Sequence, residues 1–179
     1  MTSNYITQNS LLLDNLMKFY KKNDNLEKIL PIINGESMTS LRVIDWFVTN
    51  YAKKYFTVYN KGKDRFKVYI DYKLKLKAYS KKRFDPFCRW DRINIPYKNE
   101  TYIQTTIGQL NFFRWSLEND IIKYVEENMD EIKQDQEKRN SITKNNKKNK
   151  ISRKRREELS VCASKSIKKE KVEIVVKFN

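Results

Sequence analysis

The basic side chains are the residues of this sequence whose number and spacing point most directly to chemistry. Lysine and arginine number 38 against 22 aspartates and glutamates, which gives a formal net charge of +16 in 179 residues. A protein of this size with such an excess is expected to bind a polyanion, most naturally nucleic acid. The charge alone does not rank DNA, RNA, an anionic membrane surface or an acidic protein.

The first concentration of charge lies in residues 73–92, where basic residues alternate with aromatic ones. Basic groups neutralise phosphates and aromatic rings stack on bases, so this stretch is a candidate binding face. Its aromatic members alone are better explained as core residues covered by lysine stems. The candidate nucleic-acid-binding residues are Lys73, Lys75, Lys77, Lys81, Lys82, Arg83, Arg89 and Arg92, and the aromatic residues among them are Tyr72, Tyr79, Phe84, Phe87 and Trp90.

The second concentration lies near the C-terminal end of the sequence. Eight of the thirteen residues from Lys144 to Arg156 are basic and none is acidic. Such a segment adds salt-sensitive, sequence-independent affinity for phosphates and is also typical of bipartite nuclear-localisation signals, although a solvated linker is the simpler alternative. No apolar face accompanies it, which argues against a membrane-surface helix. The candidate contacts are Lys147, Lys148, Lys150, Arg153, Lys154, Arg155 and Arg156.

Several kinds of catalytic site are excluded or disfavoured. The sequence has no histidine, which rules out Ser-His-Asp and Cys-His sites, and its three glycines form no nucleotide-binding loop. Asp45, Asp71, Asp85 and Asp91 would have to gather to form a magnesium-dependent nuclease centre, but scattered acids are more often turn formers. We therefore expect no catalytic residues, metal site or cofactor, and no small-molecule substrate.

The two cysteines, Cys88 and Cys162, are too far apart for a paired metal site and are expected to be free thiols. Cys88 lies near several arginines that would lower a thiol pKa, but a buried structural thiol is the better explanation. The sequence shows neither a signal peptide nor the roughly 20 apolar residues of a membrane span, so we expect an intracellular protein.

Hydrophobic spacing predicts the elements that must position these residues. A helix is expected over residues 11–22 after an N-cap at Ser10, with a further turn over 25–30 that Pro31 ends. Two more helices are expected after N-caps at Ser40 and Thr106, and the second of these runs to about Met129. Residues 56–59 and 66–70 form one predicted hairpin, and residues 92–97 and 101–105 a second. Residues 72–82 fit both a strand and a helix, and we favour a helix because a strand of some fourteen residues would be unusually long.

These elements predict a small single α+β domain over residues 10–130, with two β-hairpins packed on helices. Residues 131–171 have too few apolar residues for a core and are expected to form a charged, mostly disordered basic tail. Residues 172–179 alternate in hydrophobicity and form a short β-prone segment. This segment would either return to the domain as a strand or pair with a partner.

Three segments in this order resemble an uncharacterised family of proteins from nucleocytoplasmic large DNA viruses: 41–51 (LRVIDWFVTNY), 76–89 (LKAYSKKRFDPFCR) and 105–115 (TTIGQLNFFRW). The resemblance covers about residues 38–126. It implies a giant-virus origin and a place in the host cytoplasm, the viral factory or the virion. It supplies no catalytic or binding residues.

Two functions remain open. The first is a non-enzymatic nucleic-acid-binding protein that acts in viral genome packaging or transcription, mainly through phosphate contacts. The second is a protein-interaction or scaffold component of the virion or viral factory, for which an exposed apolar patch on the folded domain would be the marker.

Overall fold

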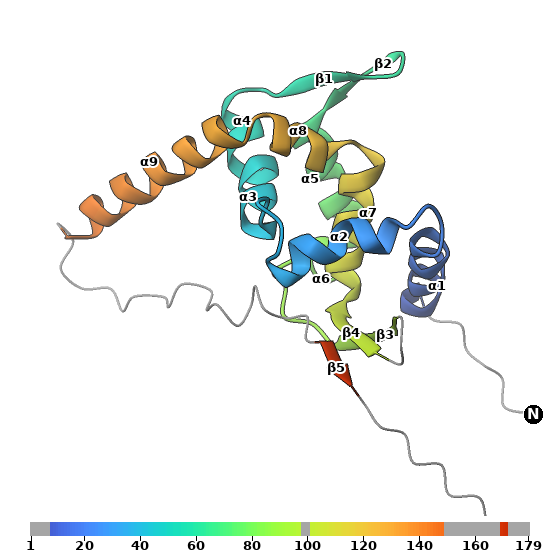
Figure 1. Ribbon diagram of the computed structural model, residues 1–179. Coiled ribbons are helices and arrows are strands. Elements are labelled where there is room, and N and C mark those ends of the chain that lie inside the picture. Colours follow the sequence, from blue (N-terminus) through green and yellow to red (C-terminus); the bar gives the residue numbers. More distant parts are fainter. Residues whose placement is uncertain (1–7, 98–100, 149–168, 172–179) are drawn as a thin grey trace, which may run out of the picture.

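The chain folds as a small α+β domain, as expected, and most of its elements are helices (Figure 1). A computed structural model describes residues 8–97, 101–148 and 169–171. The helices are α1 (Gln8–Tyr20), α2 (Asn25–Asn34), α3 (Leu41–Trp46), the π-helix η1 (Phe47–Tyr51), α4 (Ala52–Lys54), α5 (Val68–Tyr79), α6 (Lys81–Phe84), α7 (Ile107–Glu118), α8 (Ile121–Glu127) and α9 (Met129–Lys148). The strands are β1 (Val58–Lys61), β2 (Asp64–Lys67), β3 (Arg92–Pro96), β4 (Thr101–Thr106) and β5 (Lys169–Lys171).

Both predicted hairpins are present. Strands β1 and β2 pair antiparallel with Val58 opposite Lys67, and β3 and β4 pair antiparallel with Ile95 opposite Ile103. Strand β5 adds to the outer side of β4, so a late segment of the chain does return to the domain. It does so at residues 169–171, whereas the predicted β-prone segment 172–179 lies outside the described residues.

The first hairpin ends earlier than predicted. Strand β2 stops at Lys67, and Val68 already begins α5, so the expected strand through Ile70 is wrong. The helical interpretation of residues 72–82 is confirmed, with one interruption at Ser80, whose φ of 66° separates α5 from α6. Helix α5 buries Val68 and Tyr72, because the apolar positions one turn apart face the core.

Helix α2 continues through Pro31, although that residue was expected to end it. The helix stops only at Gly35, whose φ of 75° is the left-handed conformation that glycine adopts without steric cost. Proline removes one backbone donor, and the burial of Ile29, Ile32 and Ile33 on the same helix offsets that loss.

The predicted helix from Thr106 to Met129 is two helices. The Thr106 hydroxyl accepts a hydrogen bond from the Gln109 amide at 3.1 Å, which confirms the predicted cap. The chain then breaks at Asp120, which has a φ of 54°, and the second helix α8 follows. The break turns Ile121 and Val125 into the core without requiring one long straight helix.

Aromatic rings form the centre of the core. Phe84 is fully buried among the rings of Tyr72, Phe112 and Trp115 at centroid distances of 5.7 to 6.0 Å. Gly108 allows this packing, because a Cβ there would lie 3.0 Å from the backbone oxygens of Lys82 and Asp85. Helices α6 and α7 can therefore approach closely only with glycine at this position.

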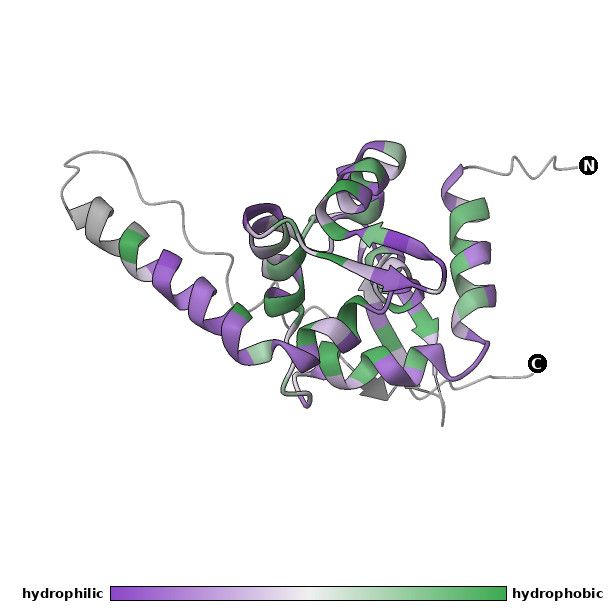
Figure 2. Cartoon of the chain, turned by 90° about the horizontal axis from the view of Figure 1, so that it is seen from above, coloured by the Kyte–Doolittle hydropathy of each residue, from purple (hydrophilic) through white to green (hydrophobic). Residues whose placement is uncertain are grey.

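Helix α9 corrects the predicted domain boundary at residue 130. It runs from Met129 to Lys148 through residues that were expected to be mostly disordered. Its first half belongs to the domain, since Ile132 is completely buried and Asp135 is only 5% exposed. Its second half extends away from the other helices, and hydrophilic residues cover most of that part (Figures 1 and 2).

Candidate nucleic-acid interface

The predicted binding residues of the first basic stretch lie on three successive elements. Lys73 and Lys77 are exposed on α5, and Lys75 is half-buried on the same helix. Lys81 and Lys82 are exposed on α6. Arg89 is exposed in the loop before β3, and Arg92 is exposed at the start of that strand.

Two of these cations have structural partners. The Nε of Arg83 donates to the Asn9 side chain at 2.7 Å and its Nη1 donates to the Gln8 side chain at 3.2 Å, so this half-buried arginine holds the start of α1. Arg92 donates to Gln104 at 2.8 Å across the second hairpin. All three bonds go to neutral amides, which leaves the positive charges of the two arginines uncompensated, and Arg83 is the less accessible of the two.

The lysines of α6 are also engaged, though more weakly. Lys81 lies 3.7 Å from the carboxylate of Asp85, and the Lys82 ammonium lies 4.1 Å above the ring of Trp90. Exposed contacts of this kind contribute little to stability, so both lysines can exchange them for a phosphate at small cost.

The aromatic residues of the same stretch are mainly core residues, as the simpler interpretation predicted. Tyr72 and Phe84 are buried, and Tyr79 and Phe87 pack against the core from partly buried positions. Trp90 is half-buried beneath Lys82. These rings are not available as a continuous stacking face for bases.

The sequence interpretation missed four exposed cations on the β1–β2 hairpin: Lys61, Lys63, Arg65 and Lys67. They lie in a segment whose residue pattern indicates only strand and turn. A window of charge extended upstream of Lys73 would have found them, since Asp64 and Asp71 are the only acids between residues 61 and 82.

The hairpin and the two helices after it carry what we call the basic strip: the exposed side chains of Lys61, Lys63, Arg65, Lys67, Lys73, Lys77, Lys81 and Lys82. Asp64 is the one exposed acid in this interval. The carboxylate of Asp71 is turned to the core side of α5, where it accepts a hydrogen bond of 2.6 Å from the indole N–H of Trp115. The negative charge of Asp71 therefore lies away from the exposed cations.

The four aspartates considered as a magnesium centre do not form one. No three histidine, cysteine or acidic side chains within the described ranges come close enough together to hold a metal ion. Burial, followed by the negative charge of Asp85, raises the pKa of Asp45 to about 7, although Lys81 opposes the shift. A carboxyl group that is half protonated near neutrality is a poor ligand for a divalent cation.

Cys88 is half-buried and is a free thiol. This is compatible with a structural role, and Cys162 lies outside the described residues.

A shallow apolar depression lies beside the cations of α5. Its volume is about 510 Å³, and it is lined by Tyr69, Ile70, Lys73, Leu74, Leu76 and Lys77. Ile70 is 54% exposed and Leu74 is 60% exposed. Exposed apolar side chains on the folded domain are one of the features expected of a protein-interaction function.

The second predicted basic cluster is reached through α9. Lys147 and Lys148 fall within this helix, whereas Lys150, Arg153, Lys154, Arg155 and Arg156 lie outside the described residues. Acids occupy the first turn of α9 and lysines its last turn, which complements the helix dipole. The helix carries this basic end away from the other helices (Figure 1).

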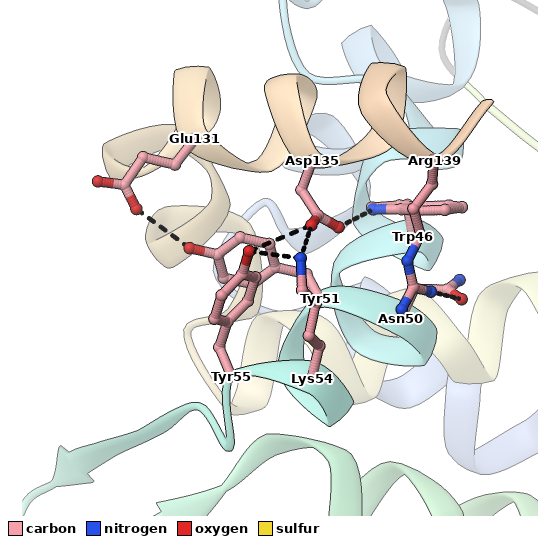
Figure 3. Close-up of polar contacts among 8 residues, drawn as sticks. All are labelled: Trp46, Asn50, Tyr51, Lys54, Tyr55, Glu131, Asp135 and Arg139. Carbon is pink, nitrogen blue, oxygen red and sulfur yellow. Dashed lines mark hydrogen bonds and ion pairs between the residues drawn. The ribbon is translucent and has the colours of Figure 1, made fainter. Parts of the chain in front are cut away.

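A polar network fixes α9 to α3, η1 and α4 (Figure 3). Asp135 accepts hydrogen bonds from Lys54 at 2.6 Å, Tyr55 at 3.2 Å and the indole of Trp46 at 3.4 Å. Around it, the Tyr51 hydroxyl donates to Glu131 at 3.0 Å and Arg139 donates to Asn50 at 3.2 Å. The π-helical turn of η1 is the element that presents Asn50 and Tyr51 to α9.

None of the helices in the described part of the chain is both long and apolar enough to span a bilayer.

The fold and the surface together define a small basic α+β protein whose described residues expose a run of cations. The chain belongs to a family of unknown function, DUF7197, whose sequence profile matches residues 3–177. It is 45% identical over 149 residues to an uncharacterised protein of Acanthamoeba polyphaga mimivirus. The aligned region is 78% of this chain and 56% of the mimivirus protein, so the chain spans little more than half the length of that relative.

These matches confirm the resemblance to uncharacterised giant-virus proteins. They also correct its extent, because the family match covers the amino-terminal helix and the basic tail as well as residues 38–126. No solved structure matches the chain.

Proposed function

We propose that this protein is a non-enzymatic nucleic-acid-binding protein that contacts phosphates through its basic strip, and that it acts in viral genome packaging or transcription. One observation carries the proposal: eight exposed cations against one exposed acid between Lys61 and Lys82, on elements that follow one another directly along the chain. A surface of this kind releases counterions from a polyanion and binds it with little sequence preference.

The tail is proposed to assist the strip. The end of α9 leads into the cluster around Arg153–Arg156, and the Asp135 network holds the beginning of that helix in a fixed direction. A basic segment tethered to a folded binding surface raises the affinity by increasing the effective concentration of the second contact.

The experiment is a salt series of fluorescence-anisotropy titrations with labelled single-stranded and double-stranded DNA and RNA. The strip variant replaces Lys63, Lys67, Lys73 and Lys77 by glutamine. Its matched control replaces Lys18, Lys21, Lys22 and Lys28, which are exposed on or beside α1 and α2, by glutamine and so removes the same charge.

The proposal predicts that the strip variant binds more weakly and with a shallower salt slope than the control, because fewer counterions are released. A chain that ends at Lys148 should bind more weakly than the full chain, because it lacks the contacts of the tail. Its remaining affinity should come from the basic strip. Equal losses in the two lysine variants would show that net charge alone governs binding and would contradict a defined strip.

A second candidate function, protein interaction, is favoured by the exposure of Ile70 and Leu74 in the depression on α5. Lys73 and Lys77 line the same depression, so a partner segment with apolar residues on one face and acids beside them is the complementary one. Replacing Ile70 and Leu74 by serine should abolish binding of a synthetic leucine–glutamate amphipathic helix and leave nucleic-acid affinity unchanged. No binding of that peptide by the unmodified protein would count against this second function.

A further inference from the structure

Phe56 has an unfavourable backbone conformation and an exposed side chain. It follows the last turn of α4 and has a φ of 48°, the left-handed conformation that glycine or asparagine normally adopts after a helix. Other non-glycine residues with a positive φ in the described part of the chain include Asn23, Asp24 and Asp120, whose short polar side chains tolerate this conformation. A phenylalanine is the unusual choice here.

Packing does not explain this choice. The Phe56 side chain is 84% exposed, whereas its aromatic neighbours Tyr51 and Tyr55 pack on one another with tilted rings, at a centroid distance of 4.5 Å, and bond to α9 through their hydroxyls. An exposed phenylalanine ring gains almost nothing from the hydrophobic effect in the free protein. Exposed aromatic rings and unfavourable backbone conformations both concentrate at binding sites.

The residue after Phe56, Thr57, fixes the backbone from which the ring projects. The Thr57 amide donates to Ala52 O at 3.2 Å, and Thr57 O accepts from the Val68 amide at 3.3 Å, which ties this turn to the first residue of α5. Thr57 is itself buried at 8% exposure. The ring therefore projects from a fixed point at the base of the β1–β2 hairpin rather than from a loose loop.

Two lysines lie close to Phe56 along the chain and across the hairpin. Lys53 lies three residues before Phe56, and its ammonium is 5.8 Å from the ring centre of Tyr69. Val58 lies two residues after Phe56 and is paired with Lys67 across the hairpin. The side chains of Val58 and Lys67 are both exposed. The ring thus lies where the basic strip begins.

We propose that Phe56 is a stacking platform for an unpaired nucleobase, which makes single-stranded nucleic acid the preferred ligand of the basic strip. The ring face binds the base and the flanking lysines bind the adjoining phosphates, a combination that is independent of base identity. In a duplex the bases are already stacked on one another and cannot reach the ring. The inference rests on the proposed function, since it names the ligand class of the same surface.

The test compares the full chain with Phe56→Ala, Phe56→Leu and Phe56→Trp for binding of a labelled oligothymidylate of roughly 20 nucleotides and of a duplex of equal length. The matched control is Met38→Ala, because Met38 is an equally exposed apolar side chain, at 84%, outside the basic strip. Thermal unfolding of each variant establishes that it is folded.

We expect Phe56→Ala and Phe56→Leu to weaken binding of the single strand about ten-fold, as the loss of one stacked base implies, with little change for the duplex. Phe56→Trp should retain the affinity, and its added fluorescence should be quenched by the oligonucleotide. Met38→Ala should bind like the unmodified protein.

Unchanged single-strand affinity in Phe56→Ala, together with a loss in the strip variant, would overturn the stacking site and leave the proposed function standing. Equal losses for single strand and duplex would also overturn it. Absence of all nucleic-acid binding by the unmodified protein at low salt would instead contradict the proposed function, and the stacking site with it.

Discussion

The ammonium of Lys54 lies 2.6 Å from the Oδ1 of Asp135 and joins α4 to α9 across 81 residues of sequence. Asp135 is nearly buried, while Lys54 is 43% exposed at its side chain. The carboxylate also accepts hydrogen bonds from Trp46 and Tyr55. A single acid thus holds the root of the helix that leads to the basic tail.

Replacing Asp135 by asparagine is expected to destabilise the domain by roughly 1–3 kcal/mol, because three donors lose a charged acceptor at a nearly buried position. Lys54→Met should also destabilise the domain, because it leaves the nearly buried carboxylate of Asp135 without its cation. Urea unfolding of the two single variants and the double variant measures their coupling. Additive losses would show that the two side chains do not stabilise each other.

The same carboxylate predicts an acid-sensitive stability. Burial opposes its ionisation, but the hydrogen bonds and charge of Lys54, with further bonds from Trp46 and Tyr55, outweigh it and hold the pKa of Asp135 below its usual value. Its contribution is therefore complete above the unfolded pKa of about 4 and is lost as the pH falls through the folded pKa. Unfolding experiments from pH 5 to pH 2 should show a smaller loss of stability in Asp135→Asn than in the unmodified protein.

Asp45 predicts the opposite pH dependence. Burial, reinforced by the charge of Asp85, raises the pKa of Asp45 to about 7, so between pH 4 and pH 7 the folded state holds a proton that the unfolded state releases. Stability attributable to this group therefore falls as the pH rises through that window. Asp45→Asn should be more stable than the unmodified protein at pH 8, by on the order of 3 kcal/mol, and nearly equal to it at pH 4.

The control for this prediction is Asp14→Asn on the exposed face of α1. It removes the same formal charge without a buried carboxyl group. An equal gain in both variants at pH 8 would assign the effect to net charge rather than to the environment of Asp45.

Local signals in the sequence were sufficient for much of the fold. The Ser40 and Thr106 caps and the two hairpins follow from residue types within a few positions. The continuation of α2 through Pro31 and the break at Asp120 did not follow, because both depend on burial against segments distant in the sequence.

The exposed cations of the candidate interface could likewise be predicted only in part. Charge density located the cations of α5 and α6, since solvated lysines need no tertiary partner to be recognised. It did not reveal that Arg83 anchors α1, or that Asp71 turns to Trp115, because these contacts join residues 74 and 44 positions apart. The polar composition after residue 130 likewise concealed Ile132 and Asp135, two buried residues through which α9 packs on the domain.

The attachment of α9 predicts where the chain can be shortened. A chain that ends at Lys148 should unfold at nearly the temperature of the full chain, whereas one that ends at Asp130 loses the fully buried Ile132 and the Asp135 network. The substitution Ile132→Ala alone should cost about 2–4 kcal/mol. Calorimetry of the three variants tests this, and equal stability of the two shortened chains would contradict it.

The close contact of α6 with α7 predicts a specific effect of Gly108. Its substitution by alanine places a Cβ 3.0 Å from two backbone oxygens of the α6 region, which cannot move without displacing Phe84. We expect a loss of about 1–3 kcal/mol, as for other overpacked cores. Glu126→Ala, at an exposed helical position in α8, is the control and should change the free energy of unfolding by less than about 0.5 kcal/mol.

Phe56 predicts a change in which stability and binding move in opposite directions. In Phe56→Asn the left-handed backbone no longer opposes a bulky side chain, and almost no buried apolar area is lost, so the free energy of unfolding should rise by about 1 kcal/mol. Single-strand affinity should fall, as for Phe56→Ala. Chemical unfolding and anisotropy on the same preparation measure both quantities. A phenylalanine kept for structure would instead make Phe56→Asn less stable, and Met38→Asn, which lacks the backbone constraint, should change neither.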